Sequence, residues 1–114
     1  MKINILPDPK YSGVCYLDTD GYIYIQDDEE GYPIYEKQDP YIGFNPKNIV
    51  KYSQMINMNP FEYLYFAILH EIGHLIHGEH EQSIENEIEA WEYALSIDSN
   101  IPRIIIITTL CSYI

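Results

Sequence analysis

Basic side chains are scarce in this chain. Its 114 residues include six Lys and Arg against 18 Asp and Glu, which gives a formal net charge of −12 at pH 7. No Lys or Arg occurs anywhere between residues 52 and 102. Binding to nucleic acid needs clustered basic groups that neutralise phosphates, so the composition argues against direct contact with nucleic acid. The same charge would steer a basic protein partner or substrate towards the surface.

Cysteines and long apolar runs are also few. Cys15 and Cys111 fit no CxxC pattern and lie far apart in the sequence. They could pair in principle, but two buried thiols in a reducing compartment are the favoured expectation. The first residues, MKINILPDP, lack the apolar run of a signal peptide, and the apolar stretch 104–114 is too short to span a bilayer. The expected setting is therefore the cytoplasm, without a membrane.

What the chain does contain is typical of one folded domain. Hydrophobic residues make up 46% of it, and twelve of the residues are Tyr. A single domain over residues 1–114 is long enough to bury a core. Residues 1–46 are rich in Tyr, Ile, Gly, Pro and Asp, which predicts strands and turns. The expected strands are 13–17 and 22–25, joined as a hairpin by Asp20-Gly21, then 32–37 after an acidic turn, and 41–44.

Residues 47–114 predict helices. Asn59 and Pro60 are suited to the start of a helix that ends near Gly78, and its apolar residues point in nearly all directions, which is typical of a buried central helix. The expected helices are 47–56, 60–77, one capped by Ser83 that runs to residue 97, and a last one that begins near Pro102. The predicted fold class is α+β, with a small antiparallel sheet in the N-terminal half packed on a helical C-terminal half.

The central helix carries the sequence His70-Glu71-Ile72-Gly73-His74, which is called the HEIGH sequence below. Residues four apart share a helix face, so His70 and His74 can present two imidazoles to one metal ion. Glu71 lies about 100° around the helix from His70, where it can hold a metal-bound water without being a ligand. This is the HExxH arrangement of zinc peptidases, in which the Glu is the general base.

A catalytic zinc site usually has three protein ligands and one position for water. His80 lies six residues after His74, which is the spacing of the metzincin pattern, but that pattern has Gly where this chain has His77, and it is followed by a Met that is absent here. The other candidate is Glu87, in the next helix. We expect His77 to be a second-shell or groove residue and keep His80 as an alternative ligand.

Helix geometry favours Glu87 as the third ligand. On the helix after Ser83, Glu87 shares the apolar face with Ala90, Trp91 and Ala94. The other acids, Glu85, Glu89 and Glu92, fall on the opposite side. Burying a carboxylate on an apolar face is costly unless a cation or strong hydrogen bonds compensate, and a metal held by the neighbouring helix would do so.

With these residues the chain resembles the ImmA/IrrE family of small metallopeptidases, a gluzincin-like group of bacteria, phages and mobile elements. The resemblance covers residues 13–97 and combines the HExGH pattern at 70–74 with a Glu-x-x-Ala pattern at Glu87–Ala90. It implies Zn²⁺ held by His70, His74 and Glu87, with Glu71 activating a water. The helix ending that is usual in the family, Leu-Leu-Met-Pro, is absent, and the segment between His74 and Glu87 is short.

The expected function is zinc-dependent hydrolysis of a peptide bond inside a specific protein substrate, carried out by a minimal zincin-like domain. Because members of the resembled family act on transcriptional repressors, the resemblance implies a basic DNA-binding regulator as substrate. An alternative also fits the charge and the Tyr-rich N-terminal half. In that alternative the chain is an acidic, non-enzymatic binding or inhibitor protein of phage or mobile-element type, and its zinc is structural.

Overall fold

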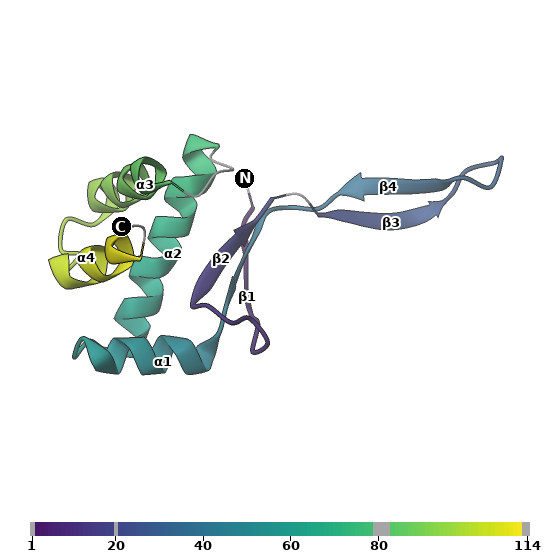
Figure 1. The fold of residues 1–114 in the computed structure, drawn as a ribbon. Helices are drawn as coiled ribbons and strands as arrows, with labels where there is room; N and C mark the ends of the chain where they lie inside the picture. Colours follow the sequence, from purple (N-terminus) through teal and green to yellow (C-terminus); the bar gives the residue numbers. More distant parts are fainter. Residues whose placement is uncertain (1, 20, 79–82, 113–114) are drawn as a thin grey trace.

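The computed structural model of the chain describes residues 2–19, 21–78 and 83–112. Within them the strands precede the helices, which confirms the α+β class (Figure 1). The elements are β1 (Asn4–Pro7), β2 (Cys15–Asp18), β3 (Tyr22–Asp27), β4 (Pro33–Lys37), β5 (Tyr41–Phe44), α1 (Pro46–Met55), α2 (Pro60–His77), α3 (Ile84–Ile97) and α4 (Arg103–Cys111).

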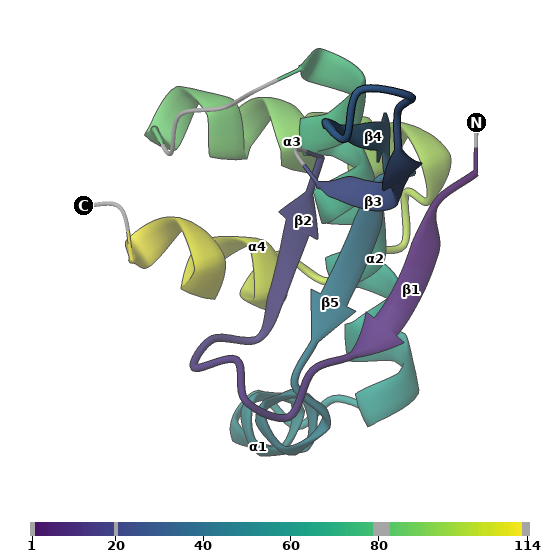
Figure 2. The ribbon, with the colours of Figure 1, turned by 90° about the vertical axis from the view of Figure 1, so that its right-hand side faces the viewer.

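The strands form two separate sheets. In the first, β5 is central, with β1 parallel to it on one side and β2 antiparallel to it on the other. This sheet is therefore mixed rather than purely antiparallel. It packs on α2 through β2, and α3 lies on the other side of α2 (Figures 1 and 2). The helix that carries the HEIGH sequence is thus central, as predicted.

The predicted hairpin at Asp20-Gly21 is wrong, because β2 pairs with β5 and β3 pairs with β4. The turn chemistry of residues 28–31 explains the actual hairpin. The Asp28 carboxylate accepts hydrogen bonds from the backbone N–H groups of Glu30 and Tyr32, and Gly31 adopts a positive φ of 88°. Strand β2 instead joins the sheet in which Ile42 of β5 is fully buried. The predicted strand 41–44 is confirmed, and 32–37 is confirmed with a start at Pro33.

The β3–β4 hairpin projects away from the rest of the molecule (Figure 1). Every position of both strands is exposed. The hairpin gives the molecule an elongated outline, with extents of 57 × 27 × 26 Å. At its base, the N–H of Gln38 donates to the carbonyl oxygen of Gly21 at 2.8 Å, which closes the two chain segments together. Residues 21–38 are called the arm below.

Local capping sets the helix ends. The side chain of Asn45 accepts hydrogen bonds from two backbone N–H groups at the start of α1, and Asn59 does the same for α2. Gly78, with φ of 65°, ends α2, and Ser83 caps α3. The predicted bounds of α2 and α3 are therefore confirmed, and the C-terminal segment is a helix after Pro102, as expected.

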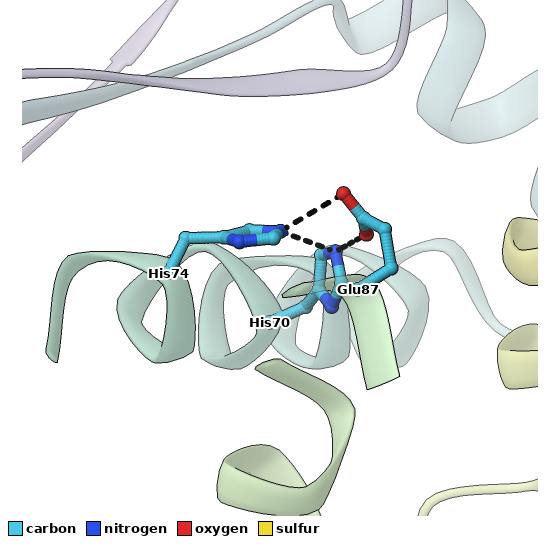
Figure 3. A group of neighbouring side chains, drawn as sticks. All are labelled: His70, His74 and Glu87. Atoms are coloured by element: carbon cyan, nitrogen blue, oxygen red, sulfur yellow. Dashed lines mark hydrogen bonds and ion pairs between the residues drawn. The ribbon is translucent and has the colours of Figure 1, made fainter. Parts of the chain in front are cut away.

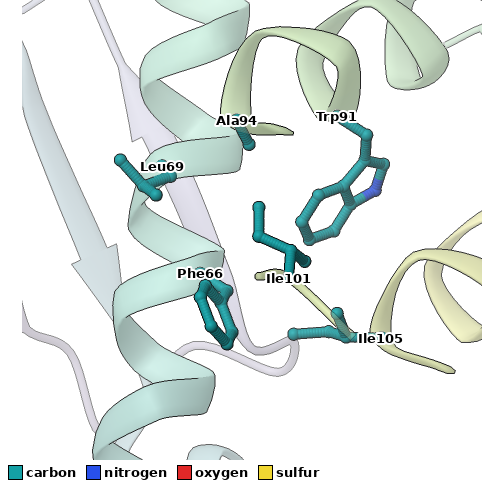
Figure 4. Close-up of a cluster of buried hydrophobic side chains, with 6 residues drawn as sticks. All are labelled: Phe66, Leu69, Trp91, Ala94, Ile101 and Ile105. Carbon is teal, nitrogen blue, oxygen red and sulfur yellow. The ribbon is translucent and has the colours of Figure 1, made fainter. Parts of the chain in front are cut away.

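The core joins α2, α3 and α4 (Figure 4). Its buried members are Phe66, Leu69, Trp91, Ala94, Ile101 and Ile105. The expectation that α2 is buried on all sides is wrong, because Phe61 is 83% exposed and Ile76 is 57% exposed. Both lie near the ends of the helix, beyond the middle section that contributes Phe66 and Leu69 to the core. None of the helices in the described residues is both long and apolar enough to cross a bilayer.

The two cysteines are free thiols, as the favoured expectation had it. The prediction that both thiols are buried is only partly correct. Cys15 is half-buried on β2, whereas Cys111 is exposed at the end of α4.

Candidate metal centre

Three side chains from two helices converge on one point (Figure 3). The Nε2 atoms of His70 and His74 lie 3.1 Å apart. The carboxylate of Glu87 faces both rings, with Oε2 at 2.7 Å from His70 Nε2 and Oε1 at 3.1 Å from His74 Nε2. The structure thus brings together the three residues that the sequence proposed as ligands, and the group could hold a metal ion. They are called the trio below.

The backbone of each helix explains this convergence. His70 and His74 are one turn apart on the same face of α2. Helix α3 comes so close to α2 that a Cβ atom on Gly73 would lie 2.6 Å from the carbonyl oxygen of Ala90. Glu87 is one turn before Ala90 on α3, so the close approach brings its carboxylate to the imidazoles. As the helical wheel predicted, Glu87 is buried, with 4% exposure.

The donor set suits a zinc-like ion. Imidazole nitrogen and carboxylate oxygen bind zinc at about 2.0–2.2 Å, so tetrahedral ligands lie roughly 3.4 Å from one another. The donor atoms of the trio need to move apart by less than an ångström to reach that spacing. Three protein ligands leave the fourth position of a tetrahedral ion for water or substrate, which is typical of catalytic sites.

The electrostatics of Glu87 favour a charged carboxylate. Burial by itself acts to raise the pKa of this group, but hydrogen bonds and charge from His70 and His74 outweigh it. The pKa of Glu87 therefore ends well below its usual range. A carboxylate that remains ionised in a buried place is ready to accept a cation.

Glu71 lies beside the trio, and its pKa is shifted in the opposite direction from that of Glu87. Burial raises the pKa of Glu71 to about 7, with a smaller opposing effect of His74 and a reinforcing effect of the Glu87 charge. Two carboxyl groups in one site thus have pKa values pushed in opposite directions, which is a common feature of catalytic acid–base sites.

Glu71 and the trio line one cleft of about 890 Å³. The walls come from β2 and the loop before it, and from all four helices. Among the other lining residues are Tyr11, Cys15, Tyr63 and Trp91. Burial raises the pKa of Tyr11, and the charge of Glu71 adds to this effect.

Trp91 supports the first imidazole. Its ring lies on that of His70, with centroids 4.2 Å apart and planes inclined by 30°. The contact limits rotation of His70 about its side-chain bonds. Sequence reasoning placed Trp91 on the face of Glu87 but gave it no role at the site. It gave no role to Tyr11 or Cys15 either, because no motif connects these residues to the HEIGH sequence.

The two remaining histidines that the sequence offers as candidates are His77 and His80. His77 is exposed at the end of α2, and its Nδ1 lies 3.9 Å from Glu89 Oε2, so it faces Glu89 rather than the trio. His80, the alternative ligand, lies outside the described residues. Comparison with known proteins adds no assignment, since no family model, curated protein or solved structure matches the chain.

Proposed function

We propose that this chain is a zinc-dependent metallopeptidase that cleaves a peptide bond within a protein substrate. The observation that carries the proposal is the convergence of two imidazole Nε2 atoms and one buried carboxylate beside Glu71, in an open cleft. His70, His74 and Glu87 would hold Zn²⁺, which polarises a carbonyl and lowers the pKa of a bound water.

Glu71 is the general base and acid in this proposal. Its carboxylate accepts a proton from the attacking water and then passes that proton to the leaving amine. A pKa near neutrality suits a group that must both take up and release a proton. Tyr11, which lines the cleft near Glu71, would donate a hydrogen bond to the developing oxyanion.

The sheet supports a peptide as the substrate. Strand β2 lies at the edge of the three-stranded sheet, with β5 on one side, and each of its residues lines the cleft. An extended peptide can add to a strand edge through main-chain hydrogen bonds. A substrate bound in this way would run along the cleft wall that faces the trio.

The pairing of the HExGH and Glu-x-x-Ala patterns in space supports an activity of the ImmA/IrrE type. In that case the substrate would be a basic DNA-binding regulator, whose charge is opposite to that of this chain. The alternative of an acidic, non-enzymatic binder with a structural metal is favoured only by the exposed arm and the net charge. The non-enzymatic alternative assigns no function to Glu71.

The deciding experiment compares the zinc-loaded protein with Glu71→Gln on a complex mixture of peptides, with new amino termini identified by mass spectrometry. We expect the wild type to cut at a recurrent sequence and Glu71→Gln to cut at least a thousandfold more slowly while still binding the metal. Glu89→Gln, an exposed acid on α3, is the matched control and should cut normally. Equal cutting by all three proteins would reject Glu71 as the base, and no cutting by any of them would favour the binding protein.

A further inference from the structure

The arm exposes an unusual concentration of large apolar side chains. Tyr22 is 66% exposed, Tyr24 54% and Tyr35 58%. Four more exposed residues of this kind lie on the same short segment, namely Ile23, Ile25, Tyr32 and Ile34. Single exposed apolar residues are normal, but a concentration of them on one short segment indicates an interaction site.

The strand register separates the two faces of the arm. Tyr24 lies opposite Tyr35, with ring centroids 6.2 Å apart in an edge-to-face arrangement, and Tyr22 lies opposite Lys37 on the same face. Ile23 and Glu36 lie on the other face. We call the first the Tyr face. A two-stranded ribbon exposed to water on both faces is only marginally stable, so a partner that covers one face would stabilise it.

The charge of the arm defines the chemistry of that partner. Residues 21–38 contain five acidic residues and one lysine. Four of the acids, residues 27–30, lie consecutively where β3 ends and the turn begins. A second copy of the chain would bring the same negative charge, whereas a basic protein would complement it.

We propose that the arm is a docking site for a basic protein, which packs apolar side chains on the Tyr face and places Lys or Arg beside the acidic turn. The arm follows directly in the sequence after residues that line the cleft. Asp18 and Thr19 line the cleft, and β3 begins at Tyr22. The base of the arm is therefore next to one end of the cleft, and a protein that packs along the Tyr face down to Tyr22 reaches that end. Delivery of a substrate segment rests on the proposed peptidase function, but binding to the arm does not.

The test uses fluorescent synthetic peptides of alternating valine and lysine, with valine–glutamate peptides for comparison, and measures binding by anisotropy. The protein is the full chain with Glu71→Gln, so that peptide cleavage cannot affect the result. We expect the lysine peptide to bind and the glutamate peptide not to bind. Binding should weaken as salt screens the charges.

The decisive variant replaces residues 22–37 with two glycines. Because Gly21 and Gln38 are already joined by a backbone hydrogen bond, the shortened chain should keep its fold and its zinc content. We expect it to bind the lysine peptide at least tenfold more weakly. Tyr22→Thr with Tyr35→Thr removes both aromatic rings but leaves residues that are favoured in strands, and it should give the same result without any change of charge.

Charge variants complete the design. Glu29→Gln with Glu30→Gln leaves Asp28, which holds the turn, unchanged, and it should weaken binding severalfold. Glu85→Gln with Glu92→Gln removes the same charge from exposed positions on α3 and should have little effect. The proposal is overturned if the lysine peptide fails to bind, if it binds the shortened chain equally well, or if sedimentation shows dimers that depend on the arm. None of these results bears on zinc binding or hydrolysis.

Discussion

Gly73 of α2 and Ala90 of α3 meet backbone to backbone, since a Cβ atom on Gly73 would lie 2.6 Å from the Ala90 carbonyl oxygen and 2.9 Å from its Cα. His70 is three residues before Gly73, and Glu87 is three residues before Ala90. The contact therefore fixes the distance between α2 and α3 within one helical turn of His70 and Glu87. It gives a physical reason for Gly in the HEIGH sequence and for Ala three residues after Glu87.

Replacing Gly73 with Ala should disturb the geometry of the trio. The added methyl group meets backbone atoms that cannot rotate away, so α3 must move and carry Glu87 with it. We expect the free energy of unfolding to fall by about 1–3 kcal/mol and zinc affinity to fall at least tenfold. Calorimetric zinc titration and thermal melts would measure both. Ile76→Ala, at an exposed position of the same helix, is the control, and Gly73→Ala behaving like it would contradict the role of the close contact.

The single tryptophan should report metal binding. Trp91 is the only one in the chain, and its ring lies on that of His70. Zinc bound to His70 changes the charge next to the indole, so its fluorescence should change during a titration and level off at one ion per chain. His74→Ala should show no such change in the same concentration range. An unaltered emission spectrum in a protein that demonstrably contains zinc would place the metal elsewhere.

Metal-free protein should lose stability in acid because of Glu87. The pKa of this carboxyl is lowered in the folded state, so its contribution to stability is complete above the ordinary value of 4.5 and is lost as the pH falls below it. The free energy of unfolding should fall by up to about 1.4 kcal/mol per pH unit in that range. Glu87→Gln should remove this part of the pH dependence. Denaturant unfolding of both proteins between about pH 3 and pH 6, a range that includes the ordinary pKa of Glu, would measure it. An unchanged slope would show that Glu87 is not held ionised by the histidines.

Two tyrosines of the cleft should differ in their effect on hydrolysis. Tyr11 is close enough to Glu71 for the charge of Glu71 to raise its pKa, whereas the raised pKa of Tyr63 comes from burial and from Tyr52 and Cys15. Tyr11→Phe should therefore lower kcat by a factor of roughly 100, the order seen when one oxyanion donor is lost, without loss of zinc. Tyr63→Phe should change kcat little. If Tyr63→Phe lowered kcat more than Tyr11→Phe did, Tyr63 would be the residue that donates a hydrogen bond to the oxyanion.

Local chemistry made the helices predictable and non-local pairing made the sheet difficult. Asn59, Gly78 and Ser83 set the ends of α2 and α3 through contacts within a few residues, so the bounds could be read from the sequence. Strand β2 pairs with β5, where Cys15 lies opposite Phe44, and β1 joins the same sheet in parallel. No nearby residue signals such pairs, so the sequence does not indicate β1, and the Asp20-Gly21 hairpin that it predicts does not form.

The same distinction holds at the site. The spacing of His70 and His74 and the helix face of Glu87 follow from helical periodicity, which is why all three could be named in advance. Tyr11 and Cys15 reach the cleft from a loop and an edge strand more than fifty residues before the HEIGH sequence. Only the packing of β2 on α2 brings them there.

Zinc content measured by elemental analysis tests the central claim most directly. The wild-type chain should bind one zinc ion, His74→Ala and Glu87→Ala should lose it, and Glu89→Ala, an exposed acid on the same helix as Glu87, should retain it. His80→Ala should also retain it. Zinc lost with His80→Ala but kept with Glu87→Ala would move the third ligand. No zinc in any sample, even after incubation with the metal, would contradict the metal centre itself.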